Sequence, residues 1–533
     1  MEQQDLNKRL LLALVLSFFV FIGYGYFFPA QKSTYSSQTT QASTQETANT
    51  ITKATPTVTN TSSAVTKNVP SGDRTSSIAI LKSNNFIMTI DHLGRIAQVE
   101  LLEKRYQAEE GVNLKMLGQG MVKPLELRFS DARLNEEAFK VSYVNAGEKV
   151  LDVNSGTKTL TLTQTLSSVV VSKLITVKPT GEYTVEIKTS KETPYFITPG
   201  HRPMADTSMY MLVRGALLKG SDNIITTIED GDALGYEKFD NAKIASAFDR
   251  YVASMFFDFK KGLNVSILKE SNADPLIFVQ GTKDLRLNAY IGPKDQKLLE
   301  SIHPELTDAI EFGWFSFLSK PFFVVLLWIN DYVGNWGWAI IIFTLLVKFI
   351  LFPLSYKGMM SMQKLKDLAP KMKEIKDKYK GDPAKMNAQM MDMYKKHGAN
   401  PMGGCLPLLL QIPVFFALYR VLLNAVELEG ASWILWIENL AQMDPYFVLP
   451  LLMGASMWFQ QRITPSNFTD PLQEKIFKFF PIIMTVFFIY FPSGLVLYWL
   501  VNNLFTIGQQ YFINYMYAKH KEEAKLLHKK KKD

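Results

Sequence analysis

The chain has 533 residues, of which 47% are hydrophobic and 20% charged, and its formal net charge is +8 at pH 7. At about 150 residues per domain, this length predicts three or four structural units. A hydrophobic fraction so close to the globular average excludes a protein embedded in a membrane along its whole length. The single cysteine, Cys405, excludes intrachain disulfides and Cys-rich zinc or iron–sulfur centres.

Motifs of common enzyme classes are missing from the sequence. The six histidines form no HExxH pair, and the chain contains neither a GxxxxGK loop nor a GxSxG elbow. A zinc protease, an ATPase and a serine hydrolase therefore have no support. We expect no enzymatic activity, no cofactor and no metal site.

The first 30 residues have the pattern of a membrane anchor. Lys8 and Arg9 precede an apolar run over residues 10–28 that ends in FPA, without a convincing small-x-small cleavage site. Because positive residues stay on the cytoplasmic side, residues 1–30 favour an uncleaved signal-anchor helix over a removed signal peptide. Residues 31–74 are rich in Ser, Thr and Gln and nearly lack aromatic residues, which predicts a disordered linker outside the membrane.

Residues 75–300 alternate between apolar and polar side chains with a period of two. Examples are FIMTI at residues 86–90, TLTLT at residues 159–163 and YTVEI at residues 183–187. Turn sequences such as DHLG and KPTG separate such runs. The spacing predicts many antiparallel strands in one large β-sandwich with a core of its own.

Two further hydrophobic patterns follow the predicted β domain. Residues 301–320 carry apolar side chains at helical spacing, including Trp314 and Phe317. An amphipathic helix of this kind beside a membrane span is typical of the membrane interface, and docking on the β domain is the alternative. Residues 321–356 contain a long apolar run and predict the second transmembrane region.

Charge assigns the remaining segments to the two sides of the membrane. Residues 357–397 hold eleven lysines and five acidic residues, a net charge of +6, and the last fifteen residues carry a net charge of +4. Residues 427–444 hold four acidic residues and no Lys or Arg. Since positive loops stay cytoplasmic, the pattern predicts six transmembrane helices with both termini in the cytoplasm.

These assignments complete the predicted organisation of the chain. Residues 357–400 form a cytoplasmic helical hairpin that is broken at Gly381-Asp382-Pro383. Residues 401–516 contain transmembrane helices three to six, and residues 517–533 form a basic cytoplasmic tail.

Lys348 conflicts with its surroundings, because it lies in the apolar run IIIFTLLVKFILF of the second span. A lysine near the middle of a ~30 Å hydrocarbon core costs on the order of 3 kcal/mol. Such a cost predicts a water-filled recess or a polar partner, and snorkelling toward the cytoplasmic face is the alternative. Thr344 lies one helical turn from Lys348, and Gln411 and Asn502 lie in other predicted spans, so their side chains could converge on it. A single polar residue in a span more often forms a hydrogen bond between helices than contacts a substrate. No carboxylate lies deep in the predicted spans, so we expect its counter-charge to arrive with a substrate.

Three motifs in the second half of the chain carry a resemblance to a known family. They are NPMGGCLP at residues 400–407, QIPVFFALY at residues 411–419 and FPSGLVLYW at residues 491–499. Together they resemble the signatures of the YidC membrane-protein insertase family, over about residues 335–515. The signal anchor, the large β domain and the six spans resemble the Gram-negative form, which has a large periplasmic domain.

The resemblance implies a polytopic α-helical membrane protein with a five-helix insertase core and an inserted periplasmic all-β supersandwich domain. The core of the family encloses a hydrophilic groove that is open to the cytoplasm and to lipid, and its single basic residue is usually arginine. Lysine keeps that charge but lacks the planar fork that binds carboxylates bidentately. We therefore expect a substrate groove formed by Lys348, Thr344, Gln411, Tyr498, Trp499 and Asn502.

The function implied by the resemblance is the insertion, folding and assembly of membrane proteins in the bacterial inner membrane, alone or with the Sec translocon. The implied partners are nascent integral membrane proteins, the Sec translocon and the ribosome, which would meet the hairpin and the basic tail. The lysines also predict contact with anionic lipids. Two other functions stay open on the residues alone: a secondary transporter of an anionic solute, and an envelope assembly scaffold that acts through the β domain.

Overall fold

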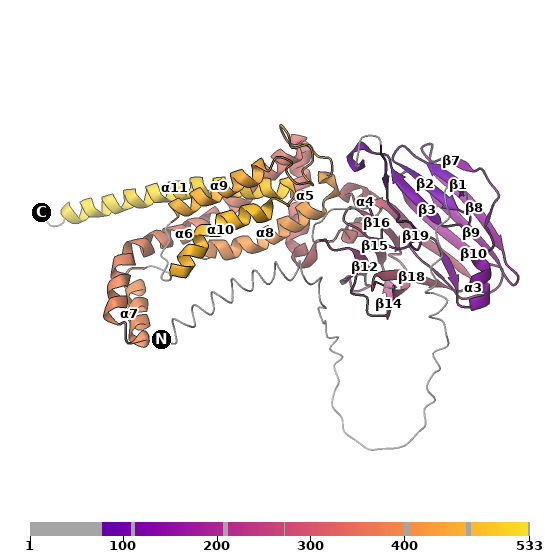
Figure 1. Ribbon diagram of the computed structural model, residues 1–533, viewed down its shortest axis with the longest axis horizontal. Helices are drawn as coiled ribbons and strands as arrows, with labels where there is room; N and C mark the ends of the chain where they lie inside the picture. The colour runs from indigo at the N-terminus through magenta and orange to yellow at the C-terminus, as the bar shows by residue number, and fades with distance from the viewer. Residues whose placement is uncertain are drawn as a thin grey trace, which may run out of the picture. The chain divides into compact units, whose positions relative to one another are not determined.

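The computed structural model describes residues 77–107, 112–205, 212–270, 272–398, 406–464 and 471–530. They belong to two compact units, one that ends at Ile310 and one that begins at Glu311 and continues to the C-terminal end (Figure 1). The predicted signal anchor and linker lie outside the described residues, as do Cys405 and most of the NPMGGCLP motif.

The unit that ends at Ile310 is built from three β-sheets. A five-stranded sheet has the order β4 (Leu114–Lys115), β3 (Ile96–Leu101), β2 (Phe86–Asp91), β1 (Ser77–Lys82) and β7 (Val150–Asp152). A nine-stranded sheet has the order β13 (Ile225–Glu229), β12 (Gly215–Lys219), β15 (Ile244–Phe248), β16 (Val252–Phe257), β19 (Asp284–Pro293), β10 (Glu182–Thr189), β9 (Val170–Val177), β8 (Lys158–Thr165) and β6 (Val144–Asn145). The third sheet has the order β14 (Tyr236–Ala242), β17 (Leu263–Lys269), β18 (Pro275–Gly281), β11 (Tyr195–Ile197) and β5 (Leu127–Phe129).

The predicted alternation of side chains is confirmed in β8, β9 and β10, whereas β12, β15 and β16 are buried at every position. Neighbouring strands pair in antiparallel fashion apart from β1 and β7, which are parallel. Along β10 every second residue is buried, namely Tyr183, Val185, Ile187 and Thr189. Strands β17 and β18 of the third sheet contact β12 and β15 of the nine-stranded sheet, so apolar faces of two sheets meet in a shared core, as in other β-sandwiches.

A buried ionic cluster joins the first sheet to the third. Arg95, which follows β2, forms ion pairs with Asp91 at 2.9 Å and with Glu126 at 2.7 Å. Arg128 of β5 pairs with the other oxygen of Glu126 at 2.6 Å. All four side chains are 0–1% exposed. Because a buried charge without a partner is costly, the cluster fixes how these two sheets meet.

Short helices complete this unit, namely η2 (Lys104–Tyr106), α3 (Ala132–Ala138), α4 (Gln296–Ile302) and η3 (Pro304–Ala309). Asp131 and Asp295 cap α3 and α4 by accepting hydrogen bonds from Leu134 N and Leu298 N, as aspartate does at many helix starts.

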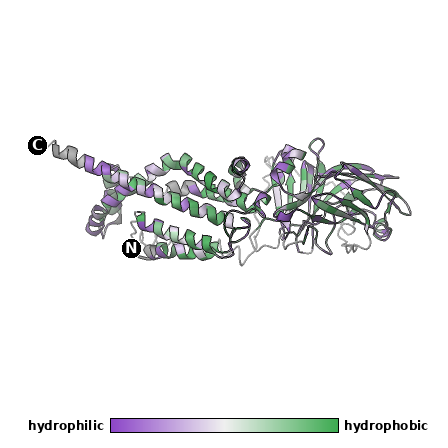
Figure 2. Cartoon of the chain, turned by 90° about the horizontal axis from the view of Figure 1, so that it is seen from above, coloured by the Kyte–Doolittle hydropathy of each residue, from purple (hydrophilic) through white to green (hydrophobic). Residues whose placement is uncertain are grey.

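The unit that begins at Glu311 is helical. Its elements are η4 (Gly313–Phe315), α5 (Ser316–Val333), α6 (Trp336–Lys378), α7 (Pro383–Lys396), α8 (Leu406–Asn424), η6 (Val426–Leu428), α9 (Val448–Ile463), α10 (Pro471–Phe488) and α11 (Ser493–Lys530). Helix α11 contacts α6, α8 and α9, while α5 contacts α6 and α8. Figure 2 shows hydrophobic residues along most of these helices and hydrophilic residues toward the C-terminal end of α11.

Length and composition mark one helix of the described part of the chain, α6, as able to cross a membrane, and Gln411–Asn424 within α8 as a shorter apolar helix. The helices α9, α10 and α11 lie where the sequence predicts spans four to six. The number of six spans stays a prediction.

The structure differs from the single helix predicted over residues 301–320. It has the end of α4, two 3-10 turns, η3 and η4, and the start of α5, with extended backbone at Ile310 after η3 and a φ of +66° at Gly313, the first residue of η4. A left-handed residue cannot continue a right-handed helix. Helix η3 contacts β15, so this part of the segment packs on the β unit, which is the alternative that the sequence left open.

Residues 321–356, which the sequence assigns to the second transmembrane region, contain parts of two helices, α5 and α6. Gly334, with φ of +68°, ends α5, and the side chain of Asn335 caps α6 by accepting a hydrogen bond from Trp338 N. These are ordinary helix stop and start signals. Phe323, Leu326 and Ile329 on α5 are buried.

Helix α6 continues without a break from the predicted span into the first arm of the predicted hairpin, ending at Lys378. The change from apolar to lysine-rich sequence does not stop the helix, because Lys, Glu and Met are good helix formers. The predicted break at Gly381-Asp382-Pro383 is confirmed, since α7 begins at Pro383 with Asp382 as its cap. Likewise α11 runs on to Lys530, through the region that the sequence separates as a tail.

Candidate substrate groove

A recess opens between three helices of the helical unit. Ten residues line it: Thr344, Val347, Lys348, Leu351, Leu354 and Ser355 of α6, Gln411 and Val414 of α8, and Tyr498 and Asn502 of α11. Five of the six predicted groove residues are among them. Lys348 is the one charged side chain of this lining, so the recess has a positive character.

The ammonium group of Lys348 has a polar partner on α11. Its Nζ donates a hydrogen bond to Thr506 Oγ1 at 3.0 Å. The Thr506 hydroxyl in turn donates to the carbonyl of Asn502 in its own helix at 2.7 Å. Because the hydroxyl proton of Thr506 is used in this second bond, a lone pair of Thr506 Oγ1 faces the Lys348 ammonium group.

The charge of Lys348 is not neutralised by a neighbouring acid. No carboxylate in the described parts of the chain lies within the 4.0 Å of an ion pair from its Nζ. An uncompensated charge beside apolar side chains is energetically costly. The recess is therefore suited to a ligand that carries a negative or strongly dipolar group.

Gln411 and Asn502 link two walls of the recess. Gln411 Nε2 on α8 donates to Asn502 Oδ1 on α11 at 2.6 Å. Thr344, 2% exposed, donates its hydroxyl proton to the carbonyl of Ile340 one turn earlier, at 2.7 Å. Its oxygen retains accepting capacity toward the recess, while the Gln411–Asn502 pair ties α8 to α11.

The recess is narrow in this state of the protein. The volume that water can occupy in it is about 20 Å³, which is enough for roughly one water molecule. Half of its walls are apolar or aromatic, from Val347, Leu351, Leu354, Val414 and Tyr498. A polypeptide segment would therefore have to displace side chains or separate the helices in order to enter.

Trp499, the sixth predicted groove residue, is not among the residues that line this recess. Its ring packs against Phe415 at 4.7 Å and Phe488 at 5.0 Å between ring centroids. Successive residues of a helix point about 100° apart, so Tyr498 faces the recess while Trp499 faces α8 and α10. Trp499 belongs to an aromatic cluster that packs these helices together.

Thr506 is one of two polar residues that sequence reasoning missed. It lies four residues after Asn502 and eight after Tyr498, and this spacing places all three on one face of a helix. The periodicity would have found it. Ser355, seven residues after Lys348, was missed in the same way and lines the recess.

Beyond the apolar part of α6, polar contacts continue between α6 and α11. Asp367 accepts hydrogen bonds from Lys521 Nζ at 2.6 Å and from Tyr517 at 3.0 Å. The hydrogen bond from Lys521 holds the pKa of the Asp367 carboxyl below its usual value. Leu368 of α6 packs with Met393 and Tyr394 of α7, so the hairpin is a packed helix pair.

The recess offers polar groups that can bind a ligand. Its described lining contains one amine, two hydroxyls of Ser and Thr, two amides and a phenol. It can host a polar or acidic group, and its amides and hydroxyls can replace the water that such a group loses.

Comparison with known proteins identifies the family of the chain. The family model described as "60Kd inner membrane protein" matches residues 328–521, and that of the "YidC periplasmic domain" matches residues 253–325. A curated protein of Campylobacter jejuni named membrane protein insertase YidC is 49% identical over 96% of this chain and 97% of its own length. The chain belongs to the YidC family.

Further YidC relatives match over nearly the same length. The proteins of Wolinella succinogenes and Helicobacter pylori strain 26695, both also named membrane protein insertase YidC, are 49% and 45% identical over 96% of this chain. A solved structure titled "Active YidC insertase crystal structure with the first transmembrane domain resolved" is 17% identical, covers 82% of this chain and 95% of that chain, and has a TM-score of 0.36. The YidC family has a β-rich periplasmic domain and a helical core and belongs to the inner membrane.

Proposed function

We propose that this chain inserts, folds and assembles membrane proteins in the bacterial inner membrane, and that the recess beside Lys348 is the place where a substrate's polar segment is held. The curated relatives carry the name membrane protein insertase. The observation that carries the proposal is the convergence of Lys348, Gln411 and Asn502 in one recess between α6, α8 and α11. A lysine charge within an apolar helix is energetically costly, and a role in substrate binding would explain its presence.

In the proposed mechanism the polar or acidic end of a nascent segment enters between α6 and α11. Its carboxylate or backbone carbonyls take the place of Thr506 as partner of Lys348, whose Nζ now bonds that hydroxyl at 3.0 Å. A lysine is a point charge with three donors, so the guest is held without a fixed geometry and can leave again. Tight binding would prevent release.

The apolar part of the segment supplies the driving force. Each CH₂ group that moves from water into lipid contributes about 0.8 kcal/mol. A segment of some twenty apolar residues thus outweighs the cost of parting the narrow recess. No nucleotide hydrolysis by this chain is needed.

The proposed topology has six transmembrane helices, with the N-terminal anchor as the first, both termini cytoplasmic and the β unit in the periplasm. The net charge of +6 over residues 357–397 supports a cytoplasmic hairpin. We place nascent chains and ribosomes at the hairpin and at the end of α11, anionic lipid along the same lysines, and the Sec translocon beside the helical unit. The chain acts as a chaperone and not as an enzyme.

Site-specific photocrosslinking tests the groove directly. A photoreactive phenylalanine analogue at Tyr498, which lines the recess, is compared with the same analogue at Trp499, which packs in the aromatic cluster. The two positions are adjacent and aromatic, so the substitution perturbs them similarly. We expect stalled nascent membrane proteins to crosslink at 498 and at Gln411, and several-fold less at 499.

A lipid-facing probe completes the design. Phe349 is 63% exposed and follows Lys348 on α6. Crosslinks confined to 349 and 499 would refute a polar groove. Solute uptake into proteoliposomes would favour an anion transporter, and loss of insertion on deletion of residues 75–290 would favour a scaffold acting through the β unit.

A further inference from the structure

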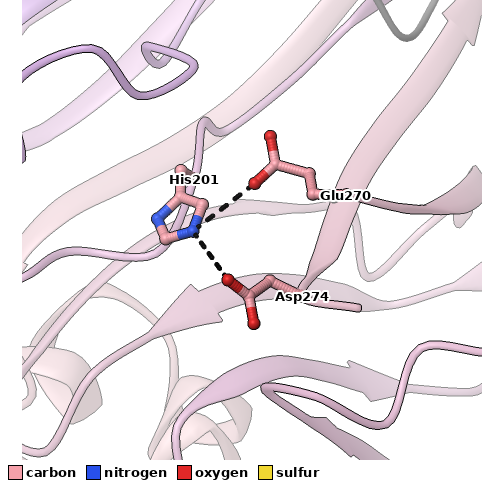
Figure 3. Close-up of side chains that lie close together, drawn as sticks. All are labelled: His201, Glu270 and Asp274. Carbon is pink, nitrogen blue, oxygen red and sulfur yellow. Dashed lines mark ion pairs between the residues drawn. The ribbon is translucent and has the colours of Figure 1, made fainter. Parts of the chain in front are cut away.

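The β unit brings together three side chains that are far apart in the sequence and that the insertion mechanism does not use. His201 follows β11, whereas Glu270 and Asp274 lie at the two ends of the turn between β17 and β18. Their ligand-type atoms all lie within 4.8 Å of one another. Figure 3 shows the imidazole facing both carboxylates.

The backbone around these residues is well held. His201 N donates to Val122 O at 2.9 Å, and Glu270 N donates to Asp274 O at 2.9 Å, which closes the turn. The preceding residue, Gly200, has φ of +91°, and a Cβ there would lie 2.7 Å from Pro124. The three side chains are therefore set in place by the fold rather than by one another.

The tautomer of His201 follows from its second contact. Its Nδ1 lies 3.0 Å from the carbonyl oxygen of Arg202. A carbonyl can only accept, so Nδ1 carries a proton, and in the neutral ring Nε2 presents a lone pair. That lone pair faces Glu270 Oε2 at 3.5 Å and Asp274 Oδ2 at 3.8 Å.

Three acceptor atoms facing one another repel unless a cation lies between them. A proton on Nε2 is one solution and would give ion pairs within 4.0 Å, although both separations exceed the roughly 2.7–3.2 Å of an N–H···O hydrogen bond. A tetrahedral metal ion with bonds of about 2.1 Å keeps its ligand atoms about 3.4 Å apart. The observed separations of 3.5 and 3.8 Å are close to that value.

Burial favours a built site over a chance surface cluster. The His201 side chain is 4% exposed, and Glu270 and Asp274 are 14% and 19% exposed. The described residues place no other hydrogen-bond donor on either carboxylate. Arg128, whose positive charge also acts on Glu270, is engaged with Glu126 at 2.6 Å.

We propose that His201, Glu270 and Asp274 bind one divalent transition metal ion, zinc by preference, as a clasp between the chain after β11 and the β17–β18 turn. One imidazole nitrogen and two carboxylate oxygens suit zinc, which takes a water as fourth ligand. Calcium and magnesium prefer a larger set of oxygen ligands. The Nδ1–H to Arg202 carbonyl bond is the orienting contact that metal-binding histidines commonly have.

The clasp stabilises the β unit and does not depend on the insertase proposal. The full chain, purified without a polyhistidine tag and stripped by a chelator, is titrated with Zn²⁺ by calorimetry and melted with and without the ion. We expect one tight zinc per chain and a raised melting temperature, because an ion that binds the folded state stabilises it.

The decisive variants are Asp274→Asn and Glu270→Gln, which keep side-chain shape at partly exposed positions. Each should weaken zinc at least about tenfold and abolish the thermal shift. Asp240→Asn is the matched control, since Asp240 is exposed on β14 of the same sheet, and it should bind zinc as the unmodified chain does. His201→Gln should abolish binding and, where the metal-free variant melts like the metal-free parent, assigns the nitrogen ligand.

Cobalt provides a second readout. Co²⁺ in a four-coordinate site absorbs visible light strongly, and this absorption should be lost in Asp274→Asn. No zinc binding by the unmodified chain would overturn the proposal. Unchanged binding in the Glu270→Gln/Asp274→Asn double variant would equally overturn it, by showing an adventitious ion only.

Discussion

Lys348 Nζ on α6 donates a hydrogen bond to Thr506 Oγ1 on α11 at 3.0 Å. The bond joins two helices that are separated by 158 positions in sequence. It gives a lysine in an apolar span a neutral partner instead of a counter-ion. The charge is thus stabilised enough to be tolerated and still available to an incoming acidic group.

The efficiency with which substrates with acidic tails are inserted should depend on the charge of residue 348. Lys348→Arg keeps the charge, so insertion should stay within about twofold of the unmodified chain, whereas Lys348→Glu should reduce it about tenfold or more, since like charges repel in a medium of low dielectric constant. In vitro insertion of a substrate with an acidic N-terminal tail measures this. A substrate with a neutral tail is the control, and equal activity of the Glu variant on both would refute charge attraction.

Removal of the Thr506 hydroxyl should destabilise the α6–α11 contact. Thr506→Val keeps the shape but removes the acceptor, which should cost about 1 kcal/mol, in the range of buried and intramembrane hydrogen bonds. Thr506→Ser retains the hydroxyl and should be nearly neutral. The measurement is thermal unfolding of the detergent-solubilised chain in a double-mutant cycle with Lys348→Met, where a coupling energy near zero would contradict the bond.

Substitution of Gly454 by alanine should disrupt the close packing of α9 on α10. A Cβ built there would overlap Thr485 Oγ1, and that hydroxyl donates a hydrogen bond to Pro481 O at 2.7 Å. We expect Gly454→Ala to destabilise the chain by about 1–3 kcal/mol, as overpacking commonly does. Thr485→Ala should restore part of that loss, because it removes the nearest atom. Protease resistance of the two single variants and the double variant in detergent tests the rescue.

The β unit should be more stable at alkaline pH than at neutral pH, because of buried lysines. Lys173 of β9 is 0% exposed and donates to the carbonyls of Gly94 and Leu125 at 3.2 and 2.8 Å. Burial lowers the pKa of Lys173 to about 7, and burial lowers that of Lys123 to about 8. Between about pH 7 and the usual lysine pKa near 10.5, the unfolded chain binds more protons than the folded one, so stability falls as pH falls through this window.

Lys173→Met tests this sign. Its unfolding free energy should depend less on pH between about 7 and 10 than that of the unmodified chain, with the remaining slope due to Lys123 and other groups. Hydrogen exchange of the β9 amides in the full chain at several pH values reports the difference. An unchanged slope would show that Lys173 does not titrate in this range.

The periodic patterns predicted the elements well where one physical requirement dominated. Strict alternation in residues 183–187 is matched by the buried face of β10, because a strand between a core and solvent has no other stable pattern. The lysine-rich sequence after residue 356 predicts a side of the membrane and says nothing about a helix end, so the continuity of α6 to Lys378 was not visible.

The site was predictable in part for a related reason. Lys348, Gln411 and Asn502 are polar within apolar runs and could be selected one by one. Whether Tyr498 or Trp499 faces the recess depends on the rotation of α11 about its axis, which its packing on α6, α8 and α9 sets.

The sequence alone determined the order of β unit and helices, the family, and the presence of one costly charge in an apolar helix, because these follow from local composition, periodicity and motifs. The tertiary structure alone decided the partners: Thr506 for Lys348, Phe415 and Phe488 for Trp499, and two carboxylates for His201. Such pairs depend on register and helix rotation over long separations in the chain. Those quantities are set by the packing of the whole unit and have no signature in any single segment.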